Sequence, residues 1–103
     1  MSGMLSIILA DDEVALIEGT IVAIEIGGCV GRLIKRAVRV PGGRCIRGTI
    51  DEFDELLGGL SREIRGFLKL DEERTGRALR KPVAGSTAAR LTTIYDNVEK
   101  QLS

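Results

Sequence analysis

The sequence predicts an α+β fold, in which an N-terminal antiparallel sheet precedes two main helices packed on it. Residues 1–50 hold short runs rich in β-branched side chains and separated by glycines, whereas residues 51–103 carry two apolar stripes at helical spacing. The chain has 103 residues, which fits a single domain, 1–103, strand-rich over 1–50 and helix-rich over 51–103. Hydrophobic residues make up 44% of it, enough for one packed core.

Four to five strands are expected in the first half, forming a sheet that is open or curled into a small barrel. The apolar run at residues 5–10 ends at a turn-prone acidic pair and is the first of them. Residues 14–18 and residues 20–26 follow, and the second run is rich in β-branched side chains. Gly27 and Gly28 are a candidate hairpin turn after these strands.

The clearest hairpin joins residues 33–40 to residues 44–50 through Pro41, Gly42 and Gly43. A two-residue loop would place Arg39 opposite Arg44, two like charges, which is unfavourable. A three-residue loop avoids this contact, makes one face largely apolar and gathers Arg39 and Arg47 on the other face. We therefore expect the three-residue loop.

Two helices are expected in the second half. Thr49 and Glu52 form a capping-box pattern before an apolar stripe at residues 53–68. Gly58–Gly59 interrupts this stripe, but the stripe stays in phase, so one kinked helix is expected. Residues 71–85 have the composition of a loop. Ser86 then caps a last helix, whose apolar stripe comprises Ala88, Leu91, Ile94, Tyr95, Val98 and Leu102.

The net charge of zero hides a strong segregation of charge. Residues 1–25 carry five acids and no base, residues 26–50 carry six bases and no acid, and residues 51–60 carry four acids. Either these segments neutralise one another in the fold, or the basic segment is a binding surface for nucleic acid or another anion. The six candidate residues for such contacts are Arg32, Lys35, Arg36, Arg39, Arg44 and Arg47.

The residue types that most catalytic and metal sites need are scarce. Histidine is absent, which removes the commonest general base and zinc ligand. Cys29 and Cys45 form no C-x-x-C pair and are expected to be free thiols in a reducing cytoplasm. The acidic run at residues 11–13 is expected to be solvated rather than to hold a metal ion. We predict no catalytic, cofactor-binding or metal-ligating residue and no enzyme activity.

Two functions remain. The leading prediction is a non-enzymatic, homo-oligomeric protein-interaction module, because both faces of residues 20–33 and a long helical stripe are apolar. The alternative is a nucleic-acid-binding protein that uses the basic hairpin at residues 32–47. A membrane partner is not expected, because no apolar stretch is long enough to span a bilayer. No base precedes Arg32 to start a secretory signal, so we expect a cytoplasmic location.

Overall fold

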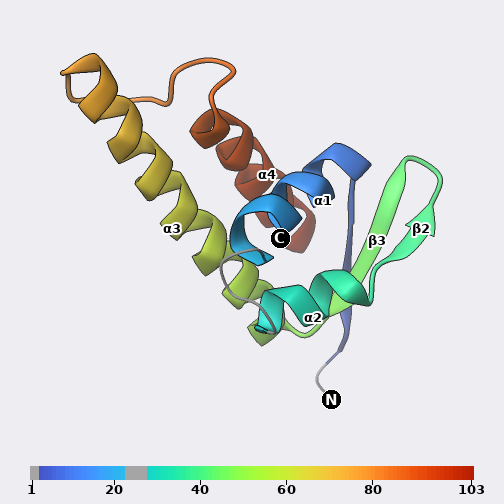
Figure 1. Ribbon diagram of the computed structural model, residues 1–103. Helices are drawn as coiled ribbons and strands as arrows, with labels where there is room; N and C mark the ends of the chain where they lie inside the picture. The colour runs from blue at the N-terminus through green and yellow to red at the C-terminus, as the bar shows by residue number, and fades with distance from the viewer. Residues whose placement is uncertain (1–2, 23–27) are drawn as a thin grey trace.

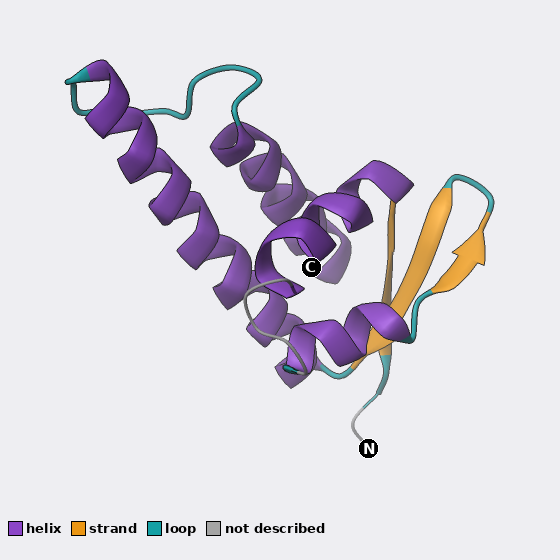
Figure 2. Cartoon of the chain, viewed as in Figure 1, coloured by secondary structure: helices purple, strands orange, loops and turns teal. Residues whose placement is uncertain are grey.

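The computed structural model describes residues 3–22 and 28–103 and confirms the α+β class (Figure 1). Helices gather on one side of a small sheet, and α3 begins at the foot of that sheet and extends away from it (Figure 2). The elements are β1 (Leu5–Leu9), α1 (Asp11–Ile17), the π-helical segment η1 (Glu18–Val22), α2 (Cys29–Lys35), β2 (Val38–Val40), β3 (Gly43–Gly48), α3 (Ile50–Thr75) and α4 (Thr87–Leu102).

The sheet is smaller than expected. Within the described residues it has three antiparallel strands in the order β1-β3-β2, so the expected four to five strands and the barrel are wrong. Residues 14–18 and 20–22 are helical instead, and Val14, Ile17 and Ile21 are buried at helical spacing. The acidic residues before them start a helix, whose N-terminus they stabilise, rather than a turn. Residues 23–26 of the expected strand, and Gly27 of the expected turn, lie outside the described residues.

The expected strand at residues 33–40 is also wrong in its first half. Residues 33–35 end α2, whose buried side chains Val30, Leu33 and Ile34 again follow helical spacing. Strand β2 is therefore only three residues long.

The hairpin has a two-residue loop, so the expected three-residue loop is wrong. Arg39 pairs with Arg44 and Val40 with Gly43, across a two-residue loop in which Gly42 has φ 89°. Gly43 is the first residue of β3, and a side chain does not fit there because a Cβ would lie 2.1 Å from the carbonyl oxygen of Leu9 in β1. The repulsion between Arg39 and Arg44 is relieved by Asp11, which lies within 4 Å of both guanidinium groups.

The outer edge of β1 is covered by α4. The backbone N–H of Ile8 donates to Gln101 Oε1 at 2.7 Å, and Gln101 Nε2 donates to the carbonyl of Ile8 at 2.9 Å. The Gln101 amide thus bonds both backbone groups that Ile8 would offer to a neighbouring strand.

The helical half agrees with expectation. One continuous helix, α3, passes through Gly58–Gly59, and its capping box is formed by Thr49 and Glu52. Gly59 is buried because η1 packs against it: a Cβ there would lie 3.2 Å from Ile21 Cγ2. Helix α3 runs to Thr75, beyond the expected start of the loop at residue 71. The Ser86 side chain caps α4 by accepting the N–H of Ala89 at 3.1 Å.

The core lies between the inner face of the sheet and the helices. Its fully buried side chains are almost all aliphatic, with Phe53 of α3 as the largest. None of the described helices is both long and apolar enough to cross a membrane.

Candidate nucleic-acid interface

Helix α2 exposes only basic side chains. Its buried residues hold it on the core, and among residues 29–36 the exposed positions are Arg32, Lys35 and Arg36. These stand at i, i+3 and i+4 and therefore share one helical face. Helix α2 is thus a short, firmly anchored support for three cations.

Two of these cations meet a cation of the hairpin at a common groove. The groove lies between η1, α2 and β3 and has a volume of about 460 Å³. Arg32, Lys35 and Arg44 line it together with one carboxylate, that of Glu18, over an apolar floor that includes Ile34. Helix and hairpin therefore contribute to one basic surface, which we call the α2–hairpin surface: Arg32, Lys35, Arg39 and Arg44.

Asp11 neutralises this surface only in part. Its carboxylate oxygens lie 3.8 Å from Arg39 Nη1 and 3.7 Å from Arg44 Nε. The side chains of Arg39 and Asp11 are 75% and 58% exposed, so water weakens both pairs. One carboxylate facing two guanidinium groups leaves a positive charge there.

Arg36 has a different partner. It forms an ion pair with Glu52, which also accepts the backbone N–H of Thr49 at 3.0 Å. The hydrogen bond from Thr49 and the Arg36 guanidinium lower the pKa of Glu52, against an opposing effect of burial. Arg36 therefore ties the end of α2 to the start of α3, and we assign it a structural role.

Arg47 lies apart from the other candidates. Strand side chains alternate between faces, and the buried Ile46 fixes the inner face of β3. Arg47 is thus on the outer face, opposite Ser6 of β1. The expectation that Arg39 and Arg47 share a polar face is wrong, because Arg39 pairs with Arg44 on the inner face.

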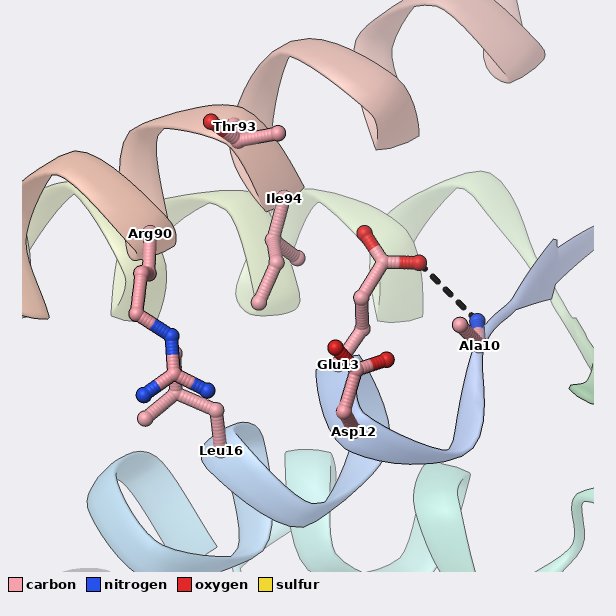
Figure 3. Close-up of a pocket in the computed structure, with 7 residues that line it drawn as sticks. All are labelled: Ala10, Asp12, Glu13, Leu16, Arg90, Thr93 and Ile94. Atoms are coloured by element: carbon pink, nitrogen blue, oxygen red, sulfur yellow. Dashed lines mark hydrogen bonds between the residues drawn. The ribbon is translucent and has the colours of Figure 1, made fainter. Parts of the chain in front are cut away.

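A second pocket lies between α1 and α4 and is lined by two residues of the acidic run at 11–13 (Figure 3). It has a volume of about 320 Å³ and is lined by Asp12, Glu13 and Arg90 among others. Glu13 accepts the backbone N–H of Ala10 at 2.9 Å, and the Asn97 amide lies 3.5 Å from its other oxygen. Glu13 thus caps the N-terminus of α1 and contacts α4, so we interpret its role as structural.

The acidic run does not converge on one point, since Asp11 turns to the hairpin and Asp12 to this pocket. In the part of the chain that the structure describes, no cluster of three or more His, Cys, Asp or Glu side chains is placed to hold a metal ion. Both cysteines are free and half-buried.

The sequence indicated the six cations but not helix α2, which carries Arg32 and Lys35 and is followed by Arg36 as its C-cap. The available signal was the alternation of Val30, Leu33 and Ile34 with Arg32 and Lys35 at helical spacing. Searches of known protein families, curated proteins and solved structures found no match for this chain.

Proposed function

We propose that the protein binds duplex DNA through the α2–hairpin surface. The observation that carries this proposal is the groove at which Arg32 and Lys35 of α2 meet Arg44 of β3. A short helix and a two-stranded ribbon are the two elements that a B-DNA major groove, about 12 Å wide, can accept. Cations on both elements then contact phosphates on either side of the groove.

The surface is better suited to duplex DNA than to other nucleic acids. Binding of single strands relies on aromatic side chains that stack on bases, and residues 1–52 contain none. The major groove of A-form RNA is deep and narrow, so a helix cannot enter it. Three of the four cations are arginines, whose planar guanidinium groups suit bidentate contact with phosphate.

The interaction-module prediction loses one of its two supports. It relied on apolar residues on both faces of residues 20–33, whereas residues 20–22 and 29–33 are helical. Their apolar side chains Ile21, Val30 and Leu33 are buried in the core of the same chain. The second support, the apolar stripe of the helical half, concerns another surface.

The proposal is tested by fluorescence anisotropy with a short labelled DNA duplex at several salt concentrations. Four phosphate contacts predict that log Kd rises with log salt with a slope of about 3 to 4. The double variant Arg32→Ala/Lys35→Ala is expected to bind roughly tenfold more weakly and to lower that slope by about 2. Similar losses are expected on duplexes of unrelated sequence, because phosphate contacts carry little sequence information.

Two single variants sharpen this test. Arg47→Ala removes the same charge from the outer face of the sheet and should leave the affinity nearly unchanged. Asp11→Asn removes the carboxylate beside Arg39 and Arg44 and should tighten binding. Absence of salt-dependent binding by the unmodified protein, or equal losses in Arg47→Ala and the α2 double variant, would contradict the proposal. Circular dichroism of each variant checks the fold.

A further inference from the structure

The pocket between α1 and α4 carries opposite charges that do not meet each other. Arg90 extends from α4 toward α1, and the carboxylates of Asp12 and Glu13 extend from α1 toward α4 (Figure 3). Neither Asp12 nor Arg90 forms an ion pair or a side-chain hydrogen bond with a described residue. Both charges are therefore available to a molecule that enters the pocket.

Apolar side chains line the pocket beside these charges. Leu16 of α1 is half-buried there, and Ile94 of α4 is buried and lies between Arg90 and Glu13 in Figure 3. An apolar group of a ligand that covers Leu16 removes its exposed part from water, which is favourable. The volume of about 320 Å³ is close to the smallest that hold small molecules, about 300 Å³. The pocket thus fits a ligand about the size of an amino acid.

The carboxylate of Glu13 is held in place without a ligand. One of its oxygens accepts the backbone N–H of Ala10 at 2.9 Å, and the other lies 3.5 Å from the Asn97 amide. The second distance is long for a hydrogen bond, so that oxygen can still accept from a stronger donor such as an ammonium group. The α1 side of the pocket therefore suits a cationic donor, whereas Arg90 on the α4 side suits a carboxylate.

We propose that this pocket binds a small zwitterion, an α-amino acid with an apolar side chain. The ammonium group donates to Asp12 and Glu13, and the carboxylate pairs with Arg90. The apolar side chain of the ligand covers Leu16 and Ile94. A ligand with a single charge leaves one side of the pocket without a partner and binds more weakly. This site is separate from the α2–hairpin surface, so the inference does not depend on DNA binding.

The test is an NMR titration of ¹⁵N-labelled protein with L-leucine in the absence of DNA. We expect a dissociation constant on the order of 1 mM and the largest shifts at residues 10–16 and 90–94. Two analogues each keep part of leucine: 4-methylpentanoate lacks the ammonium group, and 3-methylbutylamine lacks the carboxylate. Each should bind roughly tenfold more weakly than leucine, because it loses one charge-assisted contact.

Substitutions on the two sides of the pocket should affect different analogues. Arg90→Gln should weaken leucine binding roughly tenfold and leave the affinity for 3-methylbutylamine unchanged, because this amine has no group for Arg90 to bind. Asp12→Asn should weaken leucine binding by a smaller factor, because Glu13 remains. It should leave the affinity for 4-methylpentanoate unchanged.

Arg47→Gln and Asp54→Asn are the matched controls, because both residues are exposed and neither lines this pocket. Both variants should bind leucine as the unmodified protein does. The inference is overturned if leucine causes no shifts up to about 10 mM, or if the shifts lie outside the pocket. It is also overturned if either analogue binds as tightly as leucine, or if the controls lose as much affinity as Arg90→Gln in chains whose circular dichroism is unchanged.

Discussion

The α2–hairpin surface and the part of α3 beyond Leu60 differ in what they leave exposed. On α2 the apolar side chains are fully buried and the exposed ones are all cationic. On α3 the apolar side chains beyond Leu60 are only half-buried, and Leu70 is 54% exposed. A cationic surface attracts anions and is stabilised little by burial. A partly exposed apolar surface is stabilised when it is removed from water. The two surfaces therefore suit different partners.

The largest effect expected from a single substitution is that of Gly43→Ala, which breaks the hairpin and leaves α3 intact. The added Cβ meets the Leu9 carbonyl oxygen at 2.1 Å, at a residue with φ 149°. Together these should lower the free energy of unfolding by about 3 kcal/mol, as measured by urea denaturation. The displaced hairpin should also lose DNA binding.

Gly42→Ala is the control for this substitution. Gly42 also has positive φ, 89°, but nothing lies within 4 Å of its added Cβ. It should cost about 1 kcal/mol through backbone strain alone. Equal destabilisation by the two variants would show that the contact with β1 does not fix the hairpin.

A smaller effect is expected where the two regions join, at Glu52. Its folded-state pKa lies below the ordinary value of 4.5, so its ionised form stabilises the fold above that pH. This contribution is lost as the pH falls below 4.5 through the lowered folded-state pKa. Glu52→Gln should therefore make stability less dependent on pH in this acid range, as measured by urea unfolding at each pH.

Arg36→Gln serves as the comparison for that measurement. It removes one cause of the lowered pKa but keeps the Thr49 hydrogen bond. It should weaken the acid dependence less than Glu52→Gln does. An acid dependence of Glu52→Gln as steep as that of the unmodified protein would mean that another group controls acid stability.

The helical half was predictable because its signals are local. Thr49 with Glu52, and Ser86, mark helix starts, and long stripes at helical spacing follow both. The helical signals of the N-terminal half are shorter: residues 14–22 contain a glycine and are rich in β-branched side chains, and α2 has only seven residues. Their helices are held by burial of a few residues in the core rather than by propensity.

The candidate cations were predictable as residues but not as a site. Which of them meet depends on α2 being a helix and on the two-residue loop of the hairpin. That loop is favoured by contacts with distant residues, the Leu9 carbonyl against Gly43 and Asp11 between Arg39 and Arg44. The rule that like charges on paired strands repel each other considers only the two strands. It therefore misses the carboxylate of Asp11, which comes from α1 and lies near both arginines.

The most direct test of the central claim, that duplex DNA binds the α2–hairpin surface, is an NMR titration. Unlabelled duplex is added to ¹⁵N-labelled protein, and the shifts of backbone amide signals are followed. The signals of residues 29–39 and of Arg44 should shift most, and those of residues 57–68 of α3 should stay in place. Largest shifts at residues 57–68 of α3 or around Arg47, or no shifts at low salt, would contradict the claim.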